Sequence, residues 1–186
     1  MPFRPFQFAA LIAAMVFGAA LPVAARPLTA DETETLDRSV GRYLSAIGSK
    51  NAEGVVAAIP PRVLNVFAGT AGIEAKNLNA TLQKQTAEMM KDSSFSELTY
   101  DGTSLDATDV TMADGTPITW VTVPTAFTAV VKGTKTRNEQ PLLALNEGGK
   151  WYFMRIDGPQ QKMIAALAYP FLSEAAMPEA TVTPVN

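Results

Sequence analysis

Few side chains in this chain can do acid–base chemistry, because its 186 residues include neither His nor Cys. That composition excludes Ser-His and Cys-His catalytic pairs, imidazole or thiolate metal ligands, and a disulfide framework. A general base would have to be a carboxylate, a tyrosine or a lysine. The candidate catalytic residues are Asp157, which ends a strongly apolar segment, and Tyr43, which lies in the first predicted helix.

A carboxylate becomes a base near neutral pH when an apolar pocket raises its pKa. We expect Asp157 instead to be solvated or to cap the helix that begins near Pro159, so that its replacement by Asn changes stability and not turnover. Four other carboxylates lie within 14 residues, but their spacings of 5, 3 and 5 do not fit a calcium loop. They lie close to Gly or Thr, as turn residues do: Asp101, Asp106, Asp109 and Asp114. The sequence therefore predicts turns here, no metal site and no cofactor.

Aromatic side chains gather in the second half of the chain. Trp120, Phe127 and Phe153 are the candidate ligand-binding residues, as the lining of an apolar pocket. The same residues are also typical of an ordinary core between a sheet and its helices. A basic loop at residues 132–137 has the composition of a solvated hairpin tip, with an anionic partner as the alternative. The net charge of −3 offers no concentrated basic face for nucleic acid.

Residues 1–25 have the features of a secretory signal peptide. Arg4 is their only charge, an apolar run extends from Phe6 to Leu21, and Pro22 then precedes small residues at the positions that a signal peptidase recognises. The alternative is an uncleaved anchor, but the run is shorter than the ~20 residues that span a bilayer. We predict cleavage after Ala25, a periplasmic or secreted protein, and no membrane span after cleavage.

Residues 26–176 are predicted to form one α+β domain, and the Pro/Thr-rich tail at 177–186 is predicted to be disordered. Thr29 and Glu32 have the spacing of a capping box at the start of the first helix. Helical periodicity comes first, followed by β-branched and aromatic segments between turn dipeptides. The predicted helices are 30–48, 51–59, 62–67, 73–91 and 159–173, and the predicted strands are 95–101, 108–112, 118–123, 126–132, 139–146 and 150–156.

Three local features of this pattern can be tested against a structure. Pro124 should interrupt the sheet at an edge or a bulge, since it has no amide to donate. The last helix should bury Met163, Ile164 and Leu167. Apolar residues alternate on both faces of the strand at 150–156, so one face should be covered by a long helix and the other by the C-terminal helix or a second subunit.

The order of elements resembles the NTF2-like superfamily, the cone-shaped α+β fold shared by ketosteroid isomerase and the SnoaL-like proteins. The residues that carry the resemblance are the helical segment 31–59, DETETLDRSVGRYLSAIGSKNAEGVVAAI, and the terminal hairpin 141–157, PLLALNEGGKWYFMRID. The resemblance implies N-terminal helices packed on a curved antiparallel sheet around an apolar cavity, here with an additional C-terminal helix. Enzymes of the superfamily place Asp, His or Tyr in that cavity. A His-dependent activity is excluded for this chain.

The function predicted from these features is that of a small exported binding or accessory protein, which holds an apolar ligand or docks on an envelope partner. The alternative is a cofactor-free isomerase, cyclase or hydrolase that acts on an apolar substrate with a buried carboxylate. The expected partners are an apolar small molecule and either a second copy of the chain or an envelope protein. A carboxylate that faces the cavity with a raised pKa would favour the enzyme.

Overall fold

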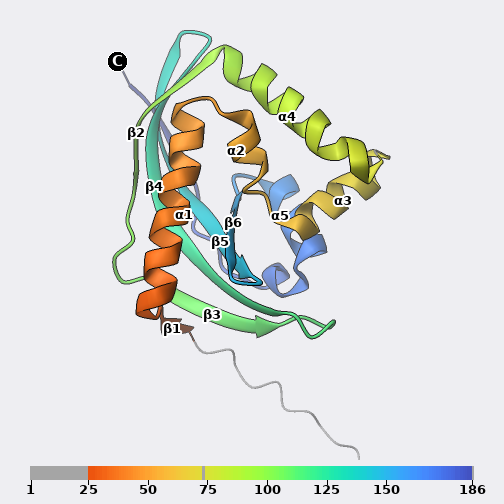
Figure 1. Cartoon of the computed structure of the whole chain (residues 1–186). Coiled ribbons are helices and arrows are strands. Elements are labelled where there is room, and N and C mark those ends of the chain that lie inside the picture. Colours follow the sequence, from red (N-terminus) through yellow and green to blue (C-terminus); the bar gives the residue numbers. More distant parts are fainter. Residues whose placement is uncertain (1–24, 73, 186) are drawn as a thin grey trace, which may run out of the picture.

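The computed structural model describes residues 25–72 and 74–185, which form a mixed fold of helices on an open, seven-stranded antiparallel sheet (Figure 1). The predicted signal peptide, apart from Ala25, lies outside the described residues. Within the described part, no helix is both long and apolar enough to cross a membrane. The helices are α1 (Ala30–Gly48), α2 (Ala52–Val56), α3 (Pro61–Ala71), α4 (Ala75–Lys91), α5 (Pro159–Ala168) and the 3-10 turn η1 (Pro170–Ser173). The strands are β1 (Ala25–Pro27), β2 (Ser93–Tyr100), β3 (Asp106–Thr111), β4 (Pro117–Val131), β5 (Thr134–Glu147), β6 (Lys150–Arg155) and β7 (Thr181–Pro184).

The start of α1 confirms the predicted capping box. The Glu32 amide donates to the Thr29 hydroxyl at 3.2 Å, and the Thr29 amide donates to the Glu32 carboxylate at 2.8 Å. These two bonds satisfy amides that have no partner inside the helix. Leu36, Val40 and Tyr43 then recur at helical spacing and are buried against the sheet. The capping box and the apolar stripe together fix where α1 begins and which face it turns to the sheet.

The long strands β4 and β5 pair along their whole length and bend around α1 (Figure 1). The prediction that Pro124 interrupts the sheet is wrong, because Pro124 lies inside the continuous strand β4, opposite Pro141 of β5. The Pro124 carbonyl accepts a hydrogen bond from Asp101, on the side away from β5. The nitrogen of a strand residue points to the same side as its carbonyl, so Pro124 removes no hydrogen bond between β4 and β5.

The predicted strands 118–123 and 126–132 are one continuous strand, β4, and each of the two long strands has different partners along its length. β3 pairs with the first half of β4 and β2 pairs with its second half. Likewise, β7 pairs with the first half of β5 and β6 pairs with its second half. Pro124 and Pro141 lie where each long strand changes partner. Prolines are tolerated there because no regular neighbour requires their amides.

Two-residue turns set the hairpins that flank β5. Lys132 and Gly133 connect β4 to β5 with φ of 50° and 82°, and Gly148 and Gly149 connect β5 to β6 with φ of 63° and 79°. Positive φ at both central residues gives the twist that a tight hairpin requires. Because the first turn is so short, most of the predicted basic loop at 132–137 belongs to β5, and pairing with β4 overrides its polar composition.

Both faces of the sheet are covered, as the alternating apolar residues of the last strand predicted. On one face, α1 packs on Val121, Val123, Leu142, Ala144, Trp151 and Phe153. On the other face, α3, α5 and η1 pack on Ile118, Leu143, Leu145, Met154 and Ile156. The sheet is therefore the middle layer of the domain, and β6 contributes to both cores.

The C-terminal elements differ from the sequence-based expectation. Met163 and Leu167 are exposed, and α5 instead buries Ala165, Ala168 and the Tyr169 that follows it. Small side chains let the helix approach the sheet closely, which places the bulky Tyr169 in the core. In the tail, Thr181–Pro184 form β7 rather than remaining disordered, because the first half of β5 leaves an open edge that a β-branched segment can pair with.

Arg26 ties the start of the domain to the sheet. Its guanidinium donates to both Glu32 carboxylate oxygens at 2.8 Å and to the carboxylate of Asp109, which also accepts from the Thr119 hydroxyl at 2.7 Å. The hydrogen bonds from Arg26 hold the pKa of Glu32 at about 2, below its ordinary value of 4.5. The ionised Glu32 therefore stabilises the folded state.

We predict that this stabilisation is lost at acidic pH. Because the folded-state pKa of Glu32 is depressed, its contribution is fully present above pH 4.5 and disappears as the pH falls toward 2. Urea unfolding at pH 6 and pH 3 should show Glu32→Gln about 1 kcal/mol less stable than the unsubstituted chain at pH 6, with the gap reduced at pH 3. Glu34→Gln is the control, since its ion pair with Arg38 is exposed. An unchanged gap at pH 3 would contradict the assignment.

Candidate functional site

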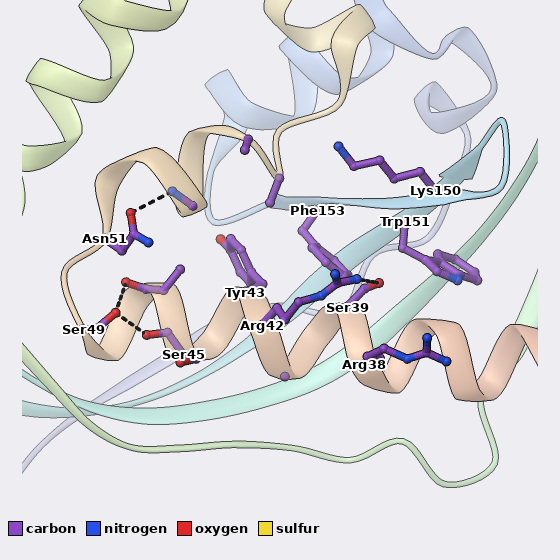
Figure 2. Close-up of a pocket in the computed structure, with 15 residues that line it drawn as sticks. Arg38, Ser39, Arg42, Tyr43, Ser45, Ser49, Asn51, Lys150, Trp151 and Phe153 are labelled. Carbon is purple, nitrogen blue, oxygen red and sulfur yellow. Dashed lines mark hydrogen bonds between the residues drawn. The ribbon is translucent and has the colours of Figure 1, made fainter.

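The site is a hollow of about 690 Å³ between α1, the α2 region and the start of β6. Figure 2 shows α1 along one side of this α1–α2 groove and β6, with the turn after α2, along the other. Its lining residues are Arg38, Ser39, Gly41, Arg42, Tyr43, Ser45, Ala46, Ser49, Asn51, Gly54, Ala57, Ala58, Lys150, Trp151 and Phe153. Three of these residues are cations and none is a carboxylate.

The polar wall of the groove comes from one stripe of α1. Arg38, Arg42, Ser45 and Ser49 follow one another at three- and four-residue spacing, which places them on one side of a helix. This stripe lies beside the buried one that includes Tyr43, so polar and apolar lining meet along the helix. The same amphipathic pattern that seats α1 on the sheet thus presents its cations to the groove.

The opposite wall depends on a close approach of α2 to α1. Asn51 caps α2 by accepting from the Gly54 amide at 3.0 Å. A Cβ on Gly54 would lie 3.0 Å from the Cβ of Ala46, so only glycine fits here without a shift. After α2, the Ala58 carbonyl accepts from the Phe153 amide at 2.7 Å, which fastens the turn after α2 to the edge of β6. These contacts hold the groove open on a rigid frame.

The floor of the groove is aromatic. The ring of Tyr43 packs on Phe153 with centroids 5.2 Å apart, and both residues are buried. Burial raises the pKa of the Tyr43 phenol; Arg155 opposes the increase and Asp157 adds to it through charge. Trp151 lies beside them and donates its indole N–H to the Thr35 hydroxyl at 3.1 Å. An apolar ligand that enters the groove would therefore contact ring and alanine carbons.

The cations at one end of the groove differ in how they are paired. Arg38 donates to Glu34 at 2.6 Å, in an exposed pair within α1. Arg42 donates only to the Ser39 hydroxyl, at 3.3 Å, and within the described residues it has no carboxylate partner. Lys150 extends from β6 with its ammonium 4.6 Å from the centre of the Tyr152 ring. Figure 2 shows the Lys150 side chain on the side of β6 away from Arg42 and α1, because alternate strand residues such as Lys150 and Tyr152 share one face.

Asp157 does not join Tyr43 in a catalytic pair. It is exposed and forms an ion pair with Arg155 at 3.6 Å, and no hydrogen bond links it to Tyr43 among the described side chains. It does not cap α5 either, because Gly158 occupies that position without a side-chain hydrogen bond. Of the two expectations for Asp157, solvation holds and capping is wrong. The structure gives no buried carboxylate at the groove for general base catalysis.

A scan against protein-family models and searches of curated proteins and of solved structures found no match to the chain. The geometry of the groove and the chemistry of its side chains are therefore the evidence for function.

The three aromatic residues predicted to bind a ligand do not share one cavity. Phe153 lies in the floor of the groove. Phe127 is on the same face of the sheet but packs on Phe95, with the Arg155 guanidinium 5.1 Å from its ring centre. Trp120 lies on the other face, where it stacks on Phe171 at 6.2 Å. Only Phe153 remains a ligand-binding candidate for the groove.

Two of the four aspartates predicted to lie in turns do so. The Asp101 carboxylate accepts from the Thr103 amide at 2.9 Å, and the Asp114 carboxylate accepts from the Thr116 amide at 3.0 Å. For Asp106 and Asp109 the prediction is wrong, because both lie in β3. Within the described residues, no group of three acidic side chains could hold a metal ion. The hairpin tip at 132–133 is exposed, as its composition predicted.

Proposed function

We propose that the chain is a small exported binding protein of the NTF2-like kind, which holds an apolar small molecule in the α1–α2 groove. The observation that carries the proposal is the groove itself: about 690 Å³ over a floor of Tyr43, Trp151 and Phe153. Pockets that hold small ligands usually measure about 300–1,000 Å³ and combine apolar lining with a few polar groups. Export is part of the proposal, and an intact mass that begins at Arg26 would support it.

The position of the groove in the fold supports the proposal further. Helix α1 rests on the concave side of β4 and β5, and the groove opens beside it, as the cavity does in the cone-shaped fold that the sequence resembles. The walls are held by the Gly54–Ala46 contact and by the hydrogen bond from Phe153 to Ala58. A preformed site of this kind binds without first having to order its own walls.

The geometry favours binding over catalysis. An isomerase, cyclase or hydrolase without a cofactor would need a carboxylate in the groove, and none of the lining residues supplies one. Asp157, the candidate base, is exposed and paired with Arg155. Tyr43 keeps its proton at neutral pH, since its ordinary pKa of 10.0 already lies well above 7 and burial raises it further. We therefore propose binding as the function and do not assign a reaction.

Filling the groove should abolish binding of an apolar probe. Ala57 is exposed and lines the groove, so Ala57→Trp places an indole in the cavity without disturbing the core. Titration calorimetry with octan-1-ol should show binding to the unsubstituted chain, and at least about tenfold weaker binding to Ala57→Trp, because the indole occupies the ligand's volume. Ala80→Trp, on an exposed position of α4, is the matched control and should bind normally. Normal binding by Ala57→Trp would refute the groove as the site.

A further inference from the structure

The cationic end of the α1–α2 groove continues into a second hollow. This smaller hollow, of about 140 Å³, is lined by Thr35, Arg38, Ser39, Arg42, Gly149, Lys150 and Trp151. Five of these residues also line the larger groove. The three cations therefore lie at the junction of the two hollows, while the aromatic and alanine floor extends away from them. The site is cationic at one end and has an aromatic floor beside a polar wall along its length.

We propose that the ligand is a single-chain amphiphile whose anionic head group binds at Arg42 and Arg38 of α1. The inference rests on the proposed function and names its ligand class. The head group is a carboxylate or a phosphate monoester, and the alkyl chain lies over Tyr43 and Phe153. Charge complementarity carries the argument, because both arginines line the two hollows and no lining residue offers a carboxylate.

Arg42 is the central contact in this site. Its guanidinium has no carboxylate partner within the described residues, so an incoming anion displaces only the 3.3 Å contact with the Ser39 hydroxyl. Arginine presents a planar fork of donors that matches a carboxylate or a phosphate. Arg38 contributes less, because Glu34 already accepts from it at 2.6 Å. Lys150 adds charge only at longer range, because its ammonium lies over the Tyr152 ring on the other side of β6.

The position of the cations within the fold makes them a site rather than scattered surface charge. Arg38 and Arg42 are one helical turn apart on α1, and Lys150 follows the tight turn at Gly148 and Gly149. Trp151, next to Lys150, is held by its hydrogen bond to Thr35 of α1. This bond holds the start of β6 against α1 and keeps the two walls of the groove at a constant separation.

The test compares four probes of equal chain length on the purified full-length chain by titration calorimetry. These are octanoate, octyl phosphate, octan-1-ol and octylammonium at neutral pH and low salt. We expect octanoate or octyl phosphate to bind at least about tenfold tighter than octan-1-ol, and octylammonium to bind weakest. The stronger of the two anions identifies the head group. Raising the salt concentration should weaken binding of the anions more than that of the alcohol.

Arg42→Gln should remove most of the preference for the anion, weakening its binding about tenfold while leaving octan-1-ol binding within about twofold. Arg38→Gln is the second variant and should give a smaller loss, because Glu34 already accepts from Arg38. Lys135→Gln is the matched control, since it removes an equal charge from the exposed β4–β5 hairpin and should change nothing. Equal binding of anion and alcohol would overturn the head-group assignment and leave the proposed function standing. Failure of all four probes would overturn both.

Discussion

Replacement of Phe153 by alanine should lower the free energy of unfolding by about 3–5 kcal/mol. Phe153 is 3% exposed in the core between α1 and the sheet, and its ring packs on that of Tyr43. Truncation removes the buried ring and leaves a cavity that the surrounding residues fill only in part, because α1 and β6 are each held by other contacts. Chemical denaturation at neutral pH, with the slope of the transition compared between variants, measures the loss.

The same substitution should also enlarge the α1–α2 groove, since Phe153 is part of its floor. Phe153→Leu is the variant for binding studies, because it keeps most of the apolar volume and should cost far less stability. Met163→Ala is the control for the size of the effect: its side chain is 58% exposed, so its loss should change stability by less than about 0.5 kcal/mol. A Phe153→Ala variant as stable as this control would remove Phe153 from the core.

Local signals in the sequence were sufficient to predict the start of α1 and the positions of the tight turns. The capping box of Thr29 and Glu32 is formed by residues three apart, so nothing distant is needed to recognise it. The Gly148-Gly149 turn likewise follows from the local demand for positive φ. The coarse α+β class could be predicted because helical and strand periodicities occupy separate parts of the chain. The pairings of β7 with β5 and of β2 with β4 could not be predicted, since they depend on which sheet edges are left open.

The face of the sheet on which a strand residue lies could not be predicted, because it depends on register. Val121 pairs with Ala144, which pairs with Phe153, so these three residues share the face under α1. Trp120 is one residue from Val121 and therefore points to the opposite face. A shift of one residue in either pairing would reverse this assignment. The sequence thus grouped Trp120 and Phe153 as aromatics, while the register separates them.

The cations of the groove were missed for a related reason. Arg38 and Arg42 lie on the exposed side of α1, where a charged stripe is also the pattern of an ordinary solvated helix. Lys150 follows a tight turn, where lysine is equally common. The packing of α1 beside β6 places Arg38 and Arg42 beside the aromatic floor, and that packing depends on Phe153 and Trp151. The helical spacing of Arg38, Arg42, Ser45 and Ser49 was the one signal available.

On the other face of the sheet, Tyr169→Ala should cost about 3–5 kcal/mol, a loss comparable to that of Phe153→Ala. Tyr169 is fully buried between α5 and the sheet, and its hydroxyl donates to the Glu147 carboxylate at 3.0 Å. Glu147 also accepts from Arg62 at 2.9 Å, so the phenol belongs to a network that links α3, β5 and the end of α5. Burial and the neighbouring Glu147 charge raise the pKa of Tyr169, so it keeps its proton and continues to donate at alkaline pH.

Tyr169→Phe separates the ring from the hydroxyl. It keeps the buried ring and removes one donor to a carboxylate that Arg62 still partly satisfies, so we expect a loss of about 1.5 kcal/mol. Leu167→Ala, on the same helix but 60% exposed, should change little. Denaturation of the three variants should therefore rank the loss from Tyr169→Ala above that from Tyr169→Phe, and the loss from Tyr169→Phe above that of the control. If Tyr169→Phe were as damaging as Tyr169→Ala, the network with Glu147 would outweigh the packing of the ring.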